Sequence, residues 1–282
     1  MANITVSNTS AVAIDVVSQY VQTYLKNNAV ILPTIIDRTS DVVPGAKQVE
    51  VGRAGSLSVG AETKVANTPY TGQTLTWTTD DLLLNLHKGV YVEMENIANI
   101  QSVIDQEAAI LERATEDLTF DLETALYTAM KVVSATTPDH RVAFKSGTTL
   151  SLEDITGARK LLNIAKVPMM DRFMIINPEQ EEDLLNLDNF RSAEKYGSNT
   201  VLMNGEIGLI FGFRVLMTNA VTADEVLFYH RSHCAFARQL AMTWENDRKL
   251  QNSSREYLLE TIYGLKMLDT GKRAILINAT GA

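Results

Sequence analysis

Apolar and polar residues alternate with a period of two between residues 41 and 92. The alternation falls in two runs, "KQVEVGRAGSLSV" and "GQTLTWTTDDLLLNLHKGVYVEM", which are separated by the polar stretch "GAETKVANTPYTG". Two apolar sets in the second run each share one face of a strand: Leu75 and Trp77, then Leu82, Leu84, Leu86, Val90 and Val92. This pattern predicts a long two-stranded ribbon with the polar stretch as its tip. Because an isolated ribbon is marginally stable in water, we expect it to lie on another surface.

The next segment has the period of an α-helix. No Gly or Pro occurs between Val90 and Thr137. Apolar and small side chains recur at spacings of three and four: Ile104, Ala108, Leu111, Thr115, Leu118, Leu122, Ala125 and Ala129. The spacing predicts one helix of roughly 40 residues, about 60 Å long, over residues 93–134. A coiled coil is the alternative, but the small and polar members of the stripe favour a helix packed along a sheet.

Beyond Pro138 short helices and strands alternate. Ser151 is a predicted helix N-cap, with Asp154 in an acidic first turn. The buried strand in "DRFMIINP" is stopped by Pro178, which stands at the first turn of the following short helix. Strand-like runs continue to the C-terminus in "EVLFYHRSHCAFARQLAMTWEN", "REYLLETIYGLKML" and "KRAILINA".

The first 40 residues differ from the rest. They contain one modest helical face, formed by Ile14, Val17, Val21 and Leu25. Pro33 ends any helix, and the chain that follows is predicted to be extended. Because this segment has too few large apolar residues for a core of its own, we expect an arm.

Composition narrows the possible functions. The chain has 282 residues, of which 45% are hydrophobic, and a formal net charge of -9. No apolar run approaches the roughly 18 residues needed to cross a bilayer, and the N-terminus lacks the pattern of a secretory signal, so we expect a soluble, intracellular protein. Cys234 is the only cysteine, which excludes an internal disulfide framework. No cluster of Lys and Arg stands out, so tight binding to DNA is not expected.

Three glycines, Gly205, Gly208 and Gly212, lie within "NGEIGLIFGFRVLMTNAV". Their spacing fits neither the dinucleotide-binding fingerprint nor the P-loop. The residues after Gly212 are strand-like, so no helix N-terminus is available there to hold a phosphate. We therefore predict that these glycines serve turns or bulges.

Two other groups of residues have features of reactive sites. Ser192 and Lys195 match S-x-x-K, but the S-D-N and K-T-G elements that accompany it in penicillin-binding families are missing. His230, His233 and Cys234 are metal-ligating types, but on a strand His233 would face away from the other two. We interpret the carboxylate clusters as solvated surfaces or helix N-terminal charge. We therefore expect no catalytic residue, cofactor or metal.

The order of segments resembles a known family. "ARKLLNIAKV", "RFMIINPEQEEDLL" and "NGEIGLIFGFRVLMTNAV", followed by "EVLFYHRSHCAFARQLAMTWEND" and "SREYLLETIYGLKMLDTGKRAILINA", are similar to segments of the tailed-bacteriophage major capsid protein. The resemblance implies the α+β Hong Kong 97-type fold. Its parts here would be an N-terminal arm (1–40), an extended β-hairpin loop (41–92), a peripheral domain with a long spine helix (93–149), an axial domain (150–232) and return strands of both domains (233–282).

This resemblance implies a structural protein and not an enzyme. It would assemble with itself into hexamers and pentamers of an icosahedral phage head that encloses double-stranded DNA without specific binding. It would reside in the virion after assembly in the host cytoplasm, without contact to a membrane. The predicted contacts with adjacent subunits are Tyr70 and Trp77 of the ribbon and Tyr24 and Leu25 of the arm. No helical scaffolding segment precedes the arm, so we expect scaffolding to be either a separate protein or absent; separate portal and decoration proteins are further candidate partners.

Other interpretations remain open at this point. The same fold would suit an encapsulin-type nanocompartment with protein cargo. A serine hydrolase using the S-x-x-K pair and a coiled-coil scaffold built on residues 93–134 are alternatives from other classes. Some family members cross-link a loop lysine to an asparagine, and Lys47, Lys64 and Asn252 are conceivable partners here. No acid catalyst can be placed beside them, so cross-linking is not predicted.

Overall fold

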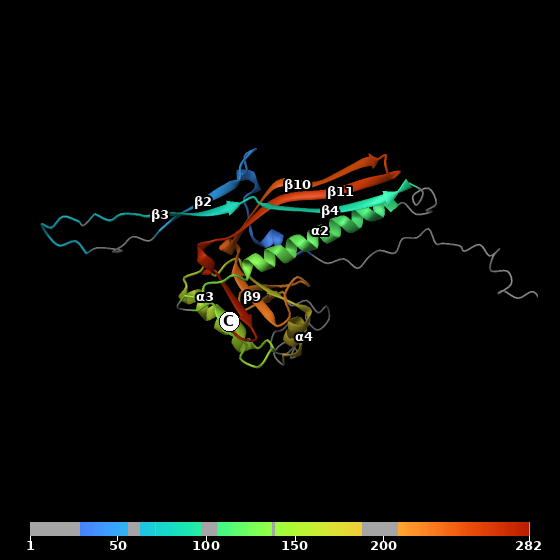
Figure 1. Cartoon of the computed structure of the whole chain (residues 1–282). Helices are drawn as coiled ribbons and strands as arrows, with labels where there is room; N and C mark the ends of the chain where they lie inside the picture. The colour runs from blue at the N-terminus through green and yellow to red at the C-terminus, as the bar shows by residue number, and fades with distance from the viewer. Residues whose placement is uncertain are drawn as a thin grey trace, which may run out of the picture.

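The computed structural model describes residues 29–55, 63–70, 72–96, 106–136, 139–187 and 208–281. Figure 1 shows a body from which two extensions leave in opposite directions, a two-stranded hairpin on the left and three long strands with a helix on the right. The fold is of the mixed α+β class that the sequence predicts. None of the helices in the described ranges is long and apolar enough to cross a membrane.

A six-stranded sheet forms the lower part of the body. Its strands, in spatial order, are β5 (Arg141–Ala143), β12 (Ala274–Asn278), β9 (Glu225–His230), β6 (Arg172–Ile176), β8 (Phe213–Met217) and β7 (Leu209–Ile210). Alternate residues of its central strands face two different hydrophobic clusters. Met174 and Phe228 lie in one cluster, whereas Phe173 and Leu227 lie in the other. Because both faces are covered, the inner residues of these strands are consecutive apolar residues, as in the run "FMII" of β6.

Two helices cover one face of this sheet, α3 (Leu152–Ile164) and α4 (Pro178–Asn186). The Ser151 side chain accepts a hydrogen bond from the backbone N–H of Asp154, whose carboxylate accepts the Ser151 N–H in return. The same reciprocal arrangement begins α4, with Pro178 at the first helical position. The predicted N-cap of α3 and the predicted proline start of α4 are both confirmed.

A four-stranded sheet forms the upper part. Its order is β1 (Ile36–Asp37), β10 (Cys234–Lys249), β11 (Ser254–Met267) and β4 (Leu86–Glu95). β1 pairs only with Ala235 and Phe236 at the start of β10, so β10, β11 and β4 continue beyond it as a three-stranded extension. Helix α2 (Gln106–Met130) runs along one face of this extension (Figure 1).

Helix α2 differs from the predicted helix at both ends. Residues 93–95 were expected to be helical, but they complete β4, which pairs antiparallel with β11. A segment without Gly or Pro suits a strand as well as a helix, so tertiary pairing with β11 decides its structure. Residues 97–105 lie outside the described ranges. The helix ends at Met130, four residues before the predicted end.

The covered face of α2 is also displaced from the predicted stripe. Ala108 and Thr115 are exposed, and Ile104 is not described. The buried apolar residues at spacings of four are Ala114, Leu118, Leu122, Leu126 and Met130. The helix nevertheless packs on a sheet, as predicted.

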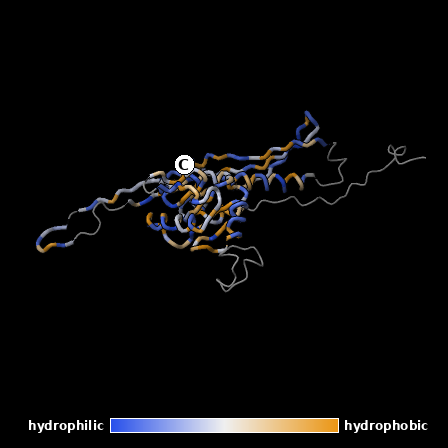
Figure 2. The backbone as a smooth tube through the Cα atoms, turned by 90° about the horizontal axis from the view of Figure 1, so that it is seen from below, coloured by the Kyte–Doolittle hydropathy of each residue, from blue (hydrophilic) through white to orange (hydrophobic). Residues whose placement is uncertain are grey.

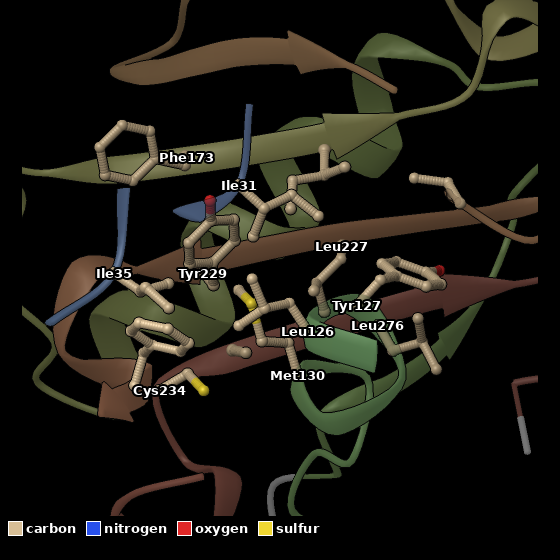
Figure 3. Close-up of a cluster of buried hydrophobic side chains, with 14 of the residues drawn as sticks. Ile31, Ile35, Leu126, Tyr127, Met130, Phe173, Leu227, Tyr229, Cys234 and Leu276 are labelled. Carbon is tan, nitrogen blue, oxygen red and sulfur yellow. The ribbon is translucent and has the colours of Figure 1, made fainter. Parts of the chain in front are cut away.

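The two sheets, α2 and the chain around residues 30–36 meet in one central core. Figure 3 shows Ile31 and Ile35 among side chains from α2 and from both sheets. Both isoleucines are buried, so this segment belongs to the body although the sequence predicts an arm without a core up to residue 40. Two isoleucines are too few to indicate a core by themselves, because the rest of this core comes from distant parts of the chain. The predicted arm helix lies outside the described residues.

The hairpin consists of β2 (Gln48–Ala54) and β3 (Trp77–Leu83), paired antiparallel. The ribbon predicted for residues 41–92 is therefore present, but its second run is divided. The first part forms β3, and after Leu84 the chain enters the four-stranded sheet as β4. Leu82 and Leu84 are buried on the same side, as predicted.

Candidate subunit-contact surfaces

The base of the hairpin is fixed to the body of its own subunit. Its apolar residues join a cluster formed by Leu82, Leu84, Ala235, Ala237 and Leu268. Arg53 forms an ion pair with Asp269. The side-chain amide of Gln239 donates a hydrogen bond to the carbonyl oxygen of Ala46 at 3.0 Å. The subunit itself therefore sets the direction in which the hairpin leaves.

Gly264 makes room for this exit. It lies in β11, and a Cβ atom added there would collide with the backbone carbonyl of Leu83, the last residue of β3. Only a residue without a side chain allows the two strands to approach so closely. The glycine thus serves the passage of the chain from the hairpin into the sheet.

The distal part of the hairpin exposes large side chains. Trp77 is 70% exposed and Tyr70 is 65% exposed, and Val65 and Leu75 are exposed as well. Figure 2 shows apolar segments along the hairpin, outside the body. The Lys64 ammonium lies 4.6 Å from the centroid of the Tyr70 ring. Exposed apolar surface of this kind is typical of sites that bind another protein.

These positions include two of the four predicted contact residues. Trp77 begins β3 and Tyr70 lies in the connection between β2 and β3; both are exposed and in the described part of the chain. Their contact with another subunit stays a prediction. Tyr24 and Leu25 lie outside the described residues.

A buried carboxylate holds the root of the N-terminal segment. Glu123 in α2 is 2% exposed, and its Oε1 accepts the backbone N–H groups of Val30 at 2.9 Å and Ile31 at 3.3 Å. Burial raises the pKa of this carboxyl, although the hydrogen bonds act in the opposite direction. The hydroxyl groups of Thr34 and Tyr229 lie 2.5 Å apart in the same core. Residues 30 and 31 are therefore held to α2 by Glu123. No sequence pattern indicates this attachment.

The far end of the β10–β11–β4 extension carries a polar network around Glu93. This carboxylate accepts hydrogen bonds from the Ser254 hydroxyl at 2.6 Å, the Asn252 amide at 3.1 Å and the Lys249 ammonium at 3.2 Å. These bonds, that of Ser254 first, lower the pKa of Glu93 to about 2. Lys249 also binds Glu256 at 2.8 Å. Asn252, a conceivable cross-link acceptor from the sequence, is thus engaged within its own subunit.

The residues considered for metal binding have structural roles. Cys234 is fully buried at the start of β10, which raises the pKa of its thiol to about 12. Nε2 of the buried His233 lies 2.8 Å from the carbonyl oxygen of Met130, and burial lowers the pKa of this histidine to about 4. His230 contacts the hydroxyl of Ser232 at 2.7 Å. Within the described ranges no three His, Cys, Asp or Glu side chains are grouped so as to hold a metal ion.

Two of the three glycines in "NGEIGLIFGFRVLMTNAV", Gly208 and Gly212, lie beside or within a tight turn. Phe211 and Gly212 form the two-residue turn between β7 and β8, and both have positive φ. Such a turn matches the twist of the flanking strands and favours glycine. Gly208, just before β7, also has positive φ. Gly205 and the S-x-x-K pair fall within residues 188–207, which the structure does not describe.

Comparison with known proteins agrees with this architecture. The family model of the phage capsid protein matches residues 97–261, more than half of the chain. No curated protein matches the sequence.

Solved structures share the fold over nearly the whole chain. A structure from Mycobacterium phage Che8 has a TM-score of 0.80 at 19% identity, covering 96% of this chain and 98% of that one. The capsid structure of cyanophage P-SCSP1u has a TM-score of 0.78 at 12% identity, covering 100% and 97%. The capsid of a native GTA particle has a TM-score of 0.72 at 11% identity, covering 99% of each chain. At these identities the likeness is one of fold, and together with the family match it establishes that the chain belongs to the phage capsid protein family as a structural major capsid protein.

Proposed function

We propose that this capsid protein assembles with copies of itself into the hexamers and pentamers of an icosahedral phage head, and that it acts as a structural protein without catalytic activity. One observation carries the proposal: Trp77 and Tyr70 are exposed on a ribbon whose base is fixed to the body of its own subunit. A hairpin that buries such residues on a neighbour suits the interfaces of obligate assemblies, which bury about 2,000–5,000 Å². Tyr24 and Leu25 of the N-terminal segment would bind a neighbouring subunit in the same way.

The head would enclose double-stranded DNA without binding it specifically. The net charge of -9 supports this, because proteins that bind DNA tightly neutralise phosphates with clustered Lys and Arg. The protein would assemble in the host cytoplasm and reside in the virion. Scaffolding, portal and decoration proteins would be separate chains.

The two sheets support the proposed domains in part. A peripheral domain (93–149) would contain α2, and an axial domain (150–232) would contain α3, α4 and β6 to β9. β5 lies within 93–149 but pairs with β12 in the six-stranded sheet, so this strand would belong to the axial side. Residues 233–282 would return strands to both, since β10 and β11 lie in one sheet and β12 in the other. The hairpin loop predicted as residues 41–92 would end near Leu84, because β4 belongs to the four-stranded sheet. The arm predicted as 1–40 would be free to bind neighbours only before residue 29, because Ile31 and Ile35 are in the core.

Negative-stain electron microscopy combined with size-exclusion chromatography of the protein expressed alone tests this function. We expect closed or tubular shells, or free pentamers and hexamers. A variant lacking residues 1–28 should remain folded but assemble poorly, whereas deletion to residue 40 would also damage the core. Wild-type protein that stays monomeric at every concentration, both alone and together with its scaffolding protein, contradicts the shell function. Normal shells from the variant lacking residues 1–28 contradict the role of the arm.

A further inference from the structure

The far end of the β10–β11–β4 extension has two faces of different charge. Trp244 of β10 and Leu259 of β11 pack with α2. Side chains on a strand alternate between the faces, so residues at even spacings from these two share the face of α2. Arg248 lies four residues after Trp244 on β10, and Arg255 lies four residues before Leu259 on β11. Both arginines are therefore on the face of α2, nearer the far end of the extension. Residues at odd spacings from Trp244 and Leu259, such as Glu245 and Glu256, point to the opposite face.

The two arginines lie directly opposite each other. Arg248 pairs with Arg255 in the β10–β11 register, and both side chains are exposed. Neither forms an ion pair with an acidic side chain in the part of the chain that the structure describes. Like charges at directly opposite positions destabilise a sheet. An anionic group from outside the subunit that binds between or beside the two guanidinium groups would remove this repulsion.

The opposite face of the same strands is acidic. Its carboxylates are Glu93, Glu95, Glu245, Asp247, Glu256 and Glu260. Lys249 binds Glu93 and Glu256, and His87 contacts Glu260 at 2.7 Å. Glu245 and Asp247, on β10, are exposed and have no basic partner among the described side chains. Negative charge therefore remains unbalanced on this face.

A shallow cavity on the acidic face has the chemistry to hold a basic side chain. It has a volume of about 310 Å³ and is lined by Tyr91, Glu245, Asn246, Asp247, Glu256 and Leu258. An arginine can lay its methylene groups along a leucine and an aromatic ring. Its guanidinium group then forms charge-assisted hydrogen bonds with the carboxylates. The lining of the cavity therefore suits an arginine such as Arg248 or Arg255, which lie on the other face of the sheet.

We propose that the acidic face of one subunit, centred on Glu245 and Asp247, binds Arg248 and Arg255 of a second copy of this chain. The two sets of charges lie on opposite faces of one short sheet, so a single subunit cannot bring them together. Contact between two different surfaces is heterologous and repeats from subunit to subunit, which produces rings or lattices. The outer edge of β10 beyond Phe236 carries no paired strand within the described residues, which leaves this end accessible.

DNA phosphates are the other anions that such arginines attract. The same end of the sheet carries six carboxylates, which repel a polyanion, and the net charge of the whole chain is -9. The carboxylates of a second subunit offer the same ligand chemistry together with a matching cavity. The charge pattern therefore favours contact between subunits. This inference rests on the proposed function and adds to it a contact that does not involve the hairpin.

Charge-reversal variants test the contact. The double variants R248E/R255E and E245R/D247R each place like charges on both faces, and the fraction of protein in shells or capsomers should fall about tenfold or more. The quadruple variant carrying all four changes exchanges the two faces and should recover assembly. The matched control is K145E/K160E, which alters two exposed lysines elsewhere and changes the net charge as R248E/R255E does. Sedimentation measures assembly, and thermal melting of each variant checks folding.

Each outcome separates the alternatives. Normal assembly of either double variant, or a quadruple variant that melts like the wild type but assembles no better than the doubles, refutes the contact and leaves the shell function intact. Normal R248E/R255E shells that retain less DNA would assign the arginines to DNA instead. Wild-type protein that assembles neither alone nor with its scaffolding protein refutes both the contact and the proposed function.

Discussion

The six-stranded sheet and the β2–β3 hairpin are both built from strands with large apolar residues, but their surroundings are opposite. In the sheet, α3 and α4 cover one face and the central core covers the other, so Phe228 and Leu227 are fully buried. In the distal hairpin, Trp77 and Tyr70 face solvent. The sheet therefore contributes to the stability of the single subunit, whereas the hairpin has apolar surface that only association can bury. Substitutions in the two regions should separate stability from assembly.

The largest loss of subunit stability is expected in the sheet. Phe228 is fully buried and meets Phe213 edge to face, with ring centroids 5.1 Å apart. Replacing Phe228 by Ala should lower the free energy of unfolding by about 3–5 kcal/mol, because a large cavity forms between well-packed layers. Urea unfolding followed by circular dichroism measures this. A loss below about 1 kcal/mol would mean that the sheet is not the core described here.

Subunit stability should also depend on pH through His233. Burial lowers the pKa of this histidine from 6.5 to about 4. As the pH falls through this window, the unfolded chain binds a proton that the folded chain does not, so stability decreases by up to about 1.4 kcal/mol per pH unit. The variant His233→Gln can still donate a hydrogen bond to the Met130 carbonyl, but it cannot titrate. Urea unfolding at several pH values between 4 and 7 should give a shallower slope for the variant; equal slopes would contradict the role of His233.

A smaller loss is expected where the N-terminal segment joins the body. Glu123→Ala leaves the N–H groups of Val30 and Ile31 without their acceptor, which should cost about 1–3 kcal/mol. Amide hydrogen exchange should become faster at residues 29–36. The control Asp117→Ala removes an exposed carboxylate of the same helix and should change stability by less than about 0.5 kcal/mol. Unchanged exchange in the Glu123 variant would show that the carboxylate does not hold the segment.

The smallest effect on the subunit is expected in the hairpin, where the effect on assembly should be large. Trp77→Ala removes an exposed side chain, so the free energy of unfolding should change by less than about 0.5 kcal/mol. The assembled fraction should fall strongly, because large aromatic residues dominate many interfaces. The neighbouring exposed residue Thr78, changed to Ala, is the control. Destabilisation of the free subunit together with normal assembly would reverse the comparison.

Local sequence signals predict those elements whose structure is decided locally. Ser151 with Asp154, and Pro178, mark the starts of α3 and α4, because capping requires particular side chains at fixed spacings. The run "RFMII" predicts a strand covered on both faces, which β6 is. The alternation around Val49 and Leu82 predicts the hairpin base.

Features that depend on distant partners are not predictable in this way. Residues 93–95 are strand because β11 lies beside them, and Ile31 is core because α2 and both sheets surround it. Glu123 has the appearance of an ordinary helix surface residue until its two backbone partners are known. Arg248 lies opposite Arg255 because of the register between β10 and β11, and the sequence alone does not specify that register.

The central claim is that assembly buries the hairpin. The chain has two tryptophans, and Trp244→Phe leaves Trp77 as the only one while keeping an aromatic ring beside Tyr257. Fluorescence of this variant should be compared between free subunits and assembled particles. We predict that Trp77 emission shifts to shorter wavelength on assembly and that its quenching by acrylamide decreases, because the indole becomes buried. Particles visible by electron microscopy whose emission and quenching equal those of the free subunit would contradict it.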